Sequence, residues 1–358
     1  MRILQVITSL LIGGAEHLVV QLVGRLREQG IETDVCLFDG ERTSFYEELE
    51  STGCKIYSLS DGANFYDLRY IPRLRRIMRN YDIIHTHNSA PQLFVAIANI
   101  ELGKKLITTE HSTNNRKRGN PFYAVIDKWM YGRYERIVCI SEVAQKKLAQ
   151  YLDEPRENLT VINNGVDVYA FHHAKLIVPT MHDGIFVTVM VAGFREAKDQ
   201  DTVIRAMELL PENYHLWLVG DGVRRIELEK EIEERHVGDR VKLWGIRSNI
   251  AQILKSADVV VMSSHWEGLS LSNIEGMAVG KPFVASDVDG LREVTKGYGI
   301  LFPHGDAQAL ADIIRQLHDD PIYYNMVAKA CYQRACQFDI SKTVERYIRV
   351  YRDVFTLN

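Results

Sequence analysis

Two glutamates, Glu267 and Glu275, could carry the chemistry of this chain, because they frame a segment of the kind that binds anions. The segment, residues 257–282, begins with the apolar run Val259 to Met262, which is typical of a strand buried on both faces of a parallel sheet. A loop follows, and then a short helix that we expect to end at Gly280. Unpaired N–H groups and the helix dipole point out of such a loop, so the sequence predicts an anion site there.

Each glutamate also has a simpler interpretation. Ser272 and Glu275 fit the S-x-x-E pattern of a capping box, in which the two side chains satisfy N–H groups at the start of a helix. Glu267 could be a solvated charge on a loop. Spacing alone does not decide between these interpretations and ligand binding, because short patterns often match by chance.

Glycines and basic residues follow two other expected strands. Gly13 and Gly14 come after the first strand and lead into a helix, so the backbone there could approach a phosphate closely. No third glycine completes a dinucleotide-binding fingerprint. Arg195 and Lys198 follow a strand at 185–191, in a pattern that surface residues before a helix also have.

Three histidines come at the ends of expected strands. His85 and His87 end one strand, and we expect one of the two to face the core with its hydrogen bonds satisfied. His111 follows the next strand and is the better functional candidate. Imidazole is a common metal ligand, but no carboxylate or cysteine joins these histidines at ligand spacing, so we expect no metal there.

Two D-x-D strings are further candidates for binding a cation. Asp201 precedes a helical stretch and is expected to be its N-cap, so Asp199 and Asp201 need not form a metal site. Asp287 and Asp289 lead into a turn and have no further acidic partner beside them. We therefore expect no metal and no cofactor.

Strands and helices alternate along the whole chain, which predicts βαβ units, parallel sheets and function at the carboxyl ends of the strands. A length of 358 residues suits two domains. We expect an N-terminal domain at 1–165, a linker at 166–184 and a C-terminal domain at 185–340. The last helix, about 341–358, has one apolar face, formed by Val344, Tyr347, Ile348, Tyr351 and Phe355.

Composition restricts the class of protein. The hydrophobic content is 46%, and the net charge of −4 excludes a strongly basic nucleic-acid binder. The five cysteines form no C-x-x-C pair, and Cys36 and Cys139 fall in apolar runs, so we expect buried thiols and a cytoplasmic protein. No apolar run reaches the ~18 residues of a membrane-spanning helix.

Basic residues are concentrated at two places in the N-terminal half. One helix carries four arginines between Arg73 and Arg79, and the Arg116-Lys117-Arg118 run precedes an aromatic pair. Solvated surface is one interpretation. Contact with anionic lipid, at the inner face of the plasma membrane, or with a lipid-diphosphate acceptor is the other.

The segment 257–282 resembles the donor-binding signature of retaining glycosyltransferases of the GT-B fold, family 4: a glutamate, seven residues, a second glutamate, and Gly-x-Pro close behind. The resemblance implies that Glu275 holds the ribose of a nucleotide and that Glu267 contacts the donor sugar. It also implies that the diphosphate is held by the backbone of Gly268, Leu269, Ser270 and Leu271.

Other motifs of that family follow in the expected order. Gly13 and Gly14 match the GGxE loop, which closes over the donor diphosphate and the acceptor. His111 matches a histidine that contacts the donor sugar and helps to position the reacting centre. Lys198 matches a lysine that binds the diphosphate.

Two further positions are less regular. Gly193 occupies the usual place of a diphosphate-binding arginine, and Arg195 lies two residues later, where it could substitute for it. The resemblance also implies that Ile246 and Arg247, in the loop after a strand at 241–244, contact the base.

The resemblance implies an α/β GT-B protein, with two Rossmann-like domains facing across a cleft and the last helix packing back on the N-terminal domain. The expected activity is retaining transfer of a sugar from a nucleotide diphosphate donor, a UDP-sugar, to a saccharide or lipid-linked acceptor in surface polysaccharide or glycolipid synthesis. The N-terminal domain would bind the acceptor and the C-terminal domain the donor. A nucleotide-sugar epimerase and a non-catalytic sugar-nucleotide-binding protein remain alternatives.

Overall fold

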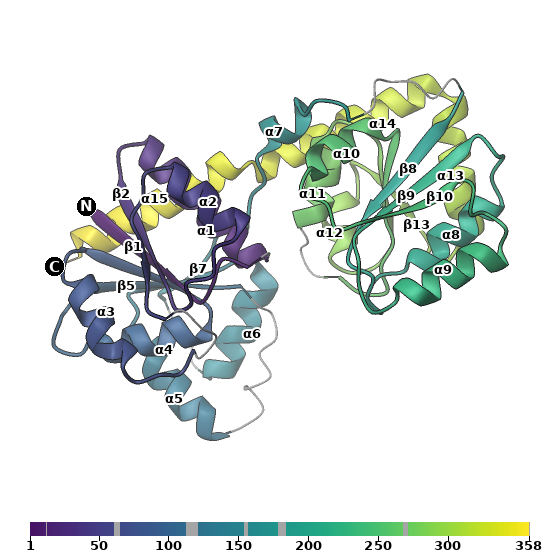
Figure 1. Ribbon diagram of the computed structural model, residues 1–358. Coiled ribbons are helices and arrows are strands. Elements are labelled where there is room, and N and C mark those ends of the chain that lie inside the picture. Colours follow the sequence, from purple (N-terminus) through teal and green to yellow (C-terminus); the bar gives the residue numbers. More distant parts are fainter. Residues whose placement is uncertain are drawn as a thin grey trace. The chain divides into compact units, whose positions relative to one another are not determined.

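The computed structural model describes the chain except for residues 12, 61–64, 112–120, 154–156, 178–183, 268–270 and 358, and at residues 121 and 122 it describes the backbone alone. The chain divides into two compact units. The first consists of Met1–Gly165 together with Ile340–Asn358, and the second of Val166–Asp339. Each unit is a parallel sheet covered by helices (Figure 1).

The first unit has, in its described part, a seven-stranded sheet in the order β3-β2-β1-β4-β5-β6-β7. Every neighbouring pair of its strands is parallel. Its elements are β1 (Arg2–Ile7), α1 (Gly14–Glu28), β2 (Glu32–Leu37), α2 (Ser44–Ser51), β3 (Ile56–Ser58), α3 (Tyr70–Met78), β4 (Ile83–His87), α4 (Ser89–Ala98), β5 (Lys105–Glu110), α5 (Pro121–Tyr131), β6 (Arg136–Cys139), α6 (Glu142–Leu152), β7 (Leu159–Val161) and α15 (Ile340–Thr356).

Side chains of its central strands alternate between two cores, as the period of two along a strand requires. Leu4 and Ile84 face a core built with α3, α4, α5 and α6. Ile3, Ile83 and Ile107 face the other side, where α1 and α15 cover the sheet (Figure 1). The strands are therefore buried on both faces, and each carries a nearly continuous apolar run.

The final helix packs on the first unit, as the resemblance implied. Val344, Tyr347, Ile348 and Tyr351 are buried in the core that contains Ile3. The expected apolar face was wrong at its end, because Phe355 is 47% exposed and Val354 is fully buried in its place. Because an α-helix has 3.6 residues per turn, the buried face moves between spacings of three and four residues. Along the 17 residues of α15 it therefore passes through position 354 and not 355.

The second unit has, within its described residues, a six-stranded parallel sheet in the order β10-β9-β8-β11-β12-β13. Helix α8 packs on α9 and α13, whereas α11 packs on α7 and α14. Its elements are α7 (Val168–His172), β8 (Phe186–Val191), α8 (Gln200–Glu208), β9 (Tyr214–Val219), α9 (Arg225–Glu234), β10 (Val241–Gly245), α10 (Ile250–Ser256), β11 (Val259–Met262), α11 (Leu271–Ala278), β12 (Phe283–Ser286), α12 (Leu291–Thr295), β13 (Ile300–Phe302), α13 (Ala307–Asp319), α14 (Pro321–Ala335) and the 3-10 helix η2 (Cys336–Phe338).

The stretch 166–184 differs from the expected linker. Val166 and Val168 are buried in the core of the second unit, and α7 packs against α10 and α11. Aperiodic sequence suggested a connection between domains, but the burial of Val166 and Val168 places residues 166–177 in the second unit. Ile340, expected in the C-terminal domain, belongs to the first unit.

Both sheets reverse their strand order once, and these reversals decide where a site can form. The chain proceeds outward from β1 to β3 and then returns to the other side of β1 with β4. The second sheet does the same from β8 through β10 to β11. The loops after β1 and β4, and those after β8 and β11, run in opposite directions and leave a crevice at the carboxyl ends of these strands.

Candidate active site

The crevice of the second unit brings Lys198 and Glu267 together. Lys198 follows β8 and Glu267 follows β11, and their side chains form an ion pair that is only 17% exposed on each side. The backbone holds the two segments in place, because His265 N–H donates to Ala197 at 3.0 Å and Asp199 N–H donates to Ser263 at 3.1 Å. Two residues that are 69 positions apart in sequence are therefore fixed side by side.

This ion pair leaves binding capacity on both partners. A lysine ammonium has three N–H donors. One donates to Glu267, and Met262 Sδ lies 3.9 Å from the nitrogen. A carboxylate accepts about four hydrogen bonds. The pair can thus bind an anion at Lys198 and hydroxyl groups at Glu267 at the same time.

Glu275 lies inside α11 and is not part of a capping box. The helix begins at Leu271, so Ser272 lies in the first turn and cannot be the N-cap that the S-x-x-E pattern suggested. Among the residues that the structure describes, none gives the Glu275 carboxylate a hydrogen bond or ion pair. Burial raises the pKa of this carboxyl from 4.5 to about 7. A partly buried carboxylate that lacks a protein partner is a candidate for binding a ligand.

The loop between the two glutamates is only partly described. Gly268, Leu269 and Ser270, which the resemblance assigned to the diphosphate, lie outside the described residues. Leu271 is the first residue of α11, so its N–H belongs to the unpaired first turn of a helix.

Arg195 folds back over the glycine that replaces the usual arginine. A Cβ built on Gly193 would lie 3.5 Å from Arg195 Nε. The Arg195 guanidinium therefore lies next to the place where an arginine side chain at position 193 would begin. Within the described residues it has no hydrogen-bond or ion-pair partner, and the residue is exposed.

The loop after β10 carries the two expected base contacts on the surface. Ile246 is 74% exposed, an unusual state for a large apolar side chain. The Arg247 guanidinium lies 5.4 Å from the ring centre of Trp244, which fixes its direction by a cation–π contact. A flat apolar and cationic surface of this kind suits a nucleobase.

In the first unit, the glycine loop and the histidines lie at the carboxyl ends of adjacent strands. Gly13 is the N-cap of α1, and a Cβ there would collide with the Glu16 carboxylate. Asn88, after β4, has a positive φ of 69° and forms a hydrogen bond with Glu16. No side chain could replace hydrogen at Gly13 without moving Glu16, whereas Gly14 has open space around it.

His111 ends a chain of hydrogen bonds that reaches the C-terminal helix. Tyr351 of α15 bonds Gln5 of β1 at 3.0 Å, Gln5 bonds His87 at 2.8 Å, and His87 bonds His111 at 2.9 Å. Tyr351 also bonds His85 at 2.7 Å. These strands are neighbours in the sheet, so the chain runs across it from one element to the next.

This chain of hydrogen bonds fixes the tautomer of His111. Gln5 Nε2 donates to Tyr351, so the Gln5 oxygen faces His87 and can only accept from His87 Nε2–H. In a neutral imidazole His87 Nδ1 is then bare and accepts from His111 Nε2–H. His111 Nδ1 is left as a bare acceptor, buried and with no partner among the described residues.

All three histidines are held in the neutral form by burial. Desolvation lowers the pKa of His85 to about 3 and that of His111 to about 4, and it lowers the pKa of His87 well below 6.5. The expectation that one of His85 and His87 faces the core was incomplete. Both are fully buried, because residues two apart on a strand point to the same face.

The aspartates of the D-x-D strings are arranged differently from the expectation. Asp199, not Asp201, is the N-cap of α8 and accepts from Thr202 N–H at 3.2 Å. Asp201 instead pairs with both terminal nitrogens of Arg224, at 2.7 and 2.8 Å. Arg292 pairs with Asp287 through Nε and with Asp289 through a terminal nitrogen. In each string an arginine forms an ion pair with an aspartate that a chelated cation would need as a ligand.

A cavity of about 420 Å³ lies between α4 and α5 of the first unit. Its wall is mixed, with the aromatic rings of Tyr66 and Tyr123 beside polar groups of Gln92 and Asp127. Such a lining can hold a sugar by stacking and hydrogen bonding, or an apolar chain.

The sequence contains a signal for one further residue of this site. Gln5 is a polar side chain inside the buried run Arg2–Ile7, and a satisfied partner was therefore required. Its partner Tyr351 is 346 residues away, which no local pattern reveals.

Two parallel α/β units with crevices at their strand reversals define the GT-B class of fold. Solved structures of low sequence identity agree: the Anabaena protein HepE in complex with UDP superposes with a TM-score of 0.83, at 22% identity, covering 99% of this chain and all of that one. The model "Glycosyl transferases group 1" matches residues 180–334, and "Glycosyltransferase Family 4" matches residues 12–169.

The chain belongs to the group 1, family 4 glycosyltransferases. The lipopolysaccharide core biosynthesis glycosyltransferase LpsD of Rhizobium meliloti is 30% identical over 86% of each chain. An Escherichia coli enzyme named UDP-Gal:alpha-D-GlcNAc-diphosphoundecaprenol alpha-1,3-galactosyltransferase is 27% identical over 92% of this chain and 88% of that one. The protein is therefore a glycosyltransferase.

Proposed function

We propose that the protein transfers a sugar from a UDP-sugar to a saccharide or lipid-linked acceptor with retention of anomeric configuration. The observation that carries this proposal is the ion pair between Lys198 and Glu267, with the unpaired Glu275 in the helix that follows. A UDP donor is supported by the names of the relatives, which include a UDP complex and a UDP-galactose reaction.

The second unit would bind the donor. Glu275 accepts hydrogen bonds from the ribose, and Glu267 accepts hydroxyls of the sugar. Lys198 and Arg195 carry the positive charge that the diphosphate needs, together with the N–H groups of the loop from Gly268 to Leu271. Ile246 and Arg247 would contact the base.

The first unit would bind the acceptor. Its cavity between α4 and α5 has the size and mixed lining that a saccharide or lipid-linked group requires. His111 would accept a hydrogen bond from a sugar hydroxyl at Nδ1, the atom that otherwise lacks a partner. The glycine loop, at Gly13 and Gly14, would supply close backbone contacts to phosphate.

The reaction needs no carboxylate nucleophile. The acceptor hydroxyl oxygen bonds to the anomeric carbon on the face from which the diphosphate departs, and the bond from that carbon to the phosphate oxygen breaks. The hydroxyl proton passes to the departing phosphate oxygen, so the products are a glycoside and a nucleoside diphosphate. Lys198 and the loop N–H groups stabilise the charge that develops on this leaving group.

Catalysis would also need no divalent cation. An ammonium and a row of backbone N–H groups can neutralise a diphosphate by themselves, and arginines bond Asp201 of one D-x-D string and Asp287 of the other.

A panel of UDP-, GDP- and ADP-sugars, offered with lipid-diphosphate-linked and free saccharide acceptors, tests the function. We expect a new glycosidic bond of retained configuration from a UDP-sugar, seen by mass spectrometry and NMR. Glu267→Gln should lower kcat, with Glu196→Gln, an exposed neighbour, as the control. Isomerised donor without transfer would identify an epimerase, and donor binding without turnover a non-catalytic protein. Either result contradicts the proposal.

A further inference from the structure

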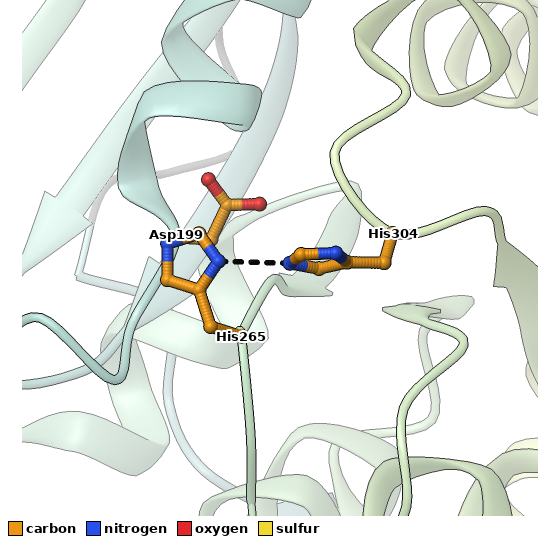
Figure 2. A group of neighbouring side chains, drawn as sticks. All are labelled: Asp199, His265 and His304. Atoms are coloured by element: carbon orange, nitrogen blue, oxygen red, sulfur yellow. Dashed lines mark hydrogen bonds between the residues drawn. The ribbon is translucent and has the colours of Figure 1, made fainter.

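Three side chains that the proposed reaction does not use converge at the carboxyl edge of the second sheet. Asp199 follows β8, His265 follows β11 and His304 follows β13. They point toward one another from these three segments (Figure 2). One ligand atom from each can be chosen so that all three atoms lie within 4.8 Å of one another.

The two imidazoles are spaced almost as metal ligands would be. His265 Nδ1 and His304 Nε2 form a hydrogen bond of 2.8 Å, and a metal bound to both nitrogens would replace the proton between them. Two nitrogens bound tetrahedrally to zinc, each about 2.0–2.1 Å from the metal, are about 3.3 Å apart. A separation of 2.8 Å therefore needs to open by only about 0.5 Å, a rotation of two exposed rings.

The carboxylate is already oriented by its surroundings. Asp199 is 2% exposed, and its two oxygens accept from Ser263 Oγ at 2.8 Å and from Thr202 N–H at 3.2 Å. Ligating carboxylates in metalloproteins are held by such neighbouring donors, and each oxygen retains a lone pair for a metal. The buried carboxylate is thus the rigid member of the group, and the two histidines are the adjustable members.

The surroundings carry an excess of negative charge. A pocket of about 360 Å³ is lined by Asp199 and His265 and also by Glu196, Asp201 and Glu231, against two arginines. Both terminal nitrogens of one of these, Arg224, bond Asp201. A cation entering this pocket would be attracted rather than repelled.

We propose that Asp199, His265 and His304 bind one zinc ion, with water or a solvent anion in the fourth position. Two imidazoles and one carboxylate match zinc, whereas Mg²⁺ and Ca²⁺ prefer oxygen ligands alone. Three protein ligands with an open fourth position form the kind of zinc site that exchanges its metal and its bound water.

The site is separate from the proposed chemistry but adjacent to it in sequence. Asp199 is next to Lys198, and His265 is two residues before Glu267. A bound zinc would tie the loops after β8, β11 and β13 to each other. It would restrict the backbone on both sides of the ion pair without entering the reaction.

The test uses the full-length, untagged, metal-stripped protein and zinc chloride. We expect calorimetry to detect one zinc per chain and thermal unfolding to shift to higher temperature with zinc. Co²⁺ should give the visible absorption of a tetrahedral site without a thiolate charge-transfer band, which excludes the five cysteines as ligands. His304→Ala and His265→Ala should each weaken zinc binding at least about tenfold.

Two comparisons keep this test decisive. His236→Asn removes an exposed histidine far from the cluster in sequence and should bind zinc as the wild type does. Unfolding curves without zinc show whether each alanine variant is folded, and Ser263→Ala offers a milder change that loosens Asp199 alone. Excess EDTA should remove the zinc-dependent stabilisation while sugar transfer continues, so the zinc site and the proposed function fail separately. The proposal is wrong if the wild type binds no zinc, or if the folded His304→Ala variant retains full affinity.

Discussion

At the scale of single residues, Glu275 shows how position changes the meaning of a carboxylate. The residue that a capping box would use to satisfy its own helix lies one turn further in, partly buried and with no partner among the described residues. Burying this carboxylate without a partner destabilises the fold, and a bound ligand would provide the missing hydrogen bonds.

Glu275→Gln should weaken binding of a UDP-sugar by roughly ten- to hundredfold, because a hydrogen bond to a charged group contributes about 1.5–3 kcal/mol. The melting temperature should not fall, since the side chain does not cap α11 and a neutral amide costs less to bury than a carboxylate. Calorimetric titration with UDP-glucose measures the affinity. Glu233→Gln, at an exposed glutamate of α9, is the matched control. Unchanged affinity in a folded Glu275→Gln protein would rule out the ribose contact.

The same carboxyl gives a dependence on pH. Its pKa in the folded protein is about 7, above the ordinary 4.5, so the folded state binds the proton more tightly than the unfolded state. The contribution of Glu275 to the free energy of unfolding therefore rises as pH falls from about 7 toward 4.5. UDP-sugar affinity should fall over the upper part of that range, because protonation removes the charged carboxylate that accepts the hydrogen bonds of the ribose. Both dependences should be missing in Glu275→Gln.

At the scale of elements, α15 is more than an apolar cover for the sheet. The Tyr351 hydroxyl accepts from Gln5 and lies 2.7 Å from His85 Nδ1, inside a core that excludes water. The helix thus sets the orientation of Gln5, and through His87 it sets which nitrogen of His111 carries the proton.

Tyr351→Phe should lower the free energy of unfolding by about 2 kcal/mol, because it leaves two buried atoms, Gln5 Nε2 and His85 Nδ1, without their hydrogen-bond partner. It should also lower kcat more than it raises KM, since Gln5 can then rotate and release the tautomer of His111. Denaturant unfolding and steady-state kinetics measure the two effects.

Phe355→Leu, on the same helix but 47% exposed, is the control and should change neither quantity. If Tyr351→Phe lost stability while kcat remained at the wild-type value, the hydrogen-bond chain would be structural only.

At the scale of the whole molecule, some basic residues of the first unit bond backbone carbonyls and others are exposed to solvent. Arg73 and Arg75 of α3 donate to the carbonyls of Leu59 and Ile100. Arg76 and Arg79 are exposed. The Arg116-Lys117-Arg118 run lies outside the described residues. No helix in the described part of the chain is both long and apolar enough to cross a membrane.

We expect binding to anionic vesicles through α3, weakened by salt because exposed charges are screened. Arg76→Glu with Arg79→Glu should lower the vesicle partition constant, measured by sedimentation, by at least about thirtyfold, since each basic residue near an anionic surface contributes about 1 kcal/mol. Lys296→Glu with Lys329→Glu makes the same change of charge on exposed lysines of the second unit and should have no effect. Sedimentation that is independent of anionic lipid and of salt would contradict this membrane contact.

Much of the fold was predictable from local pattern. The run Val259 to Met262 is a strand as expected, and the final helix packs on the first unit as the resemblance implied. Periods of 2 and 3.6 residues are properties of the chain itself, so they survive whatever the elements pack against. The errors fall where one or two contacts decide, as at Val166 and Val168 or between Asp199 and Asp201.

The sequence by itself determined which residues follow strands, and therefore which side chains lie at the carboxyl edges of two parallel sheets. Only the tertiary structure decided which of them meet. Strand order places β11 next to β8, so Glu267 pairs with Lys198. Packing of α15 on the first sheet brings Tyr351 to Gln5 across 346 residues. Such partners depend on how distant elements pack, and packing is settled by burial of many side chains at once rather than by any local spacing.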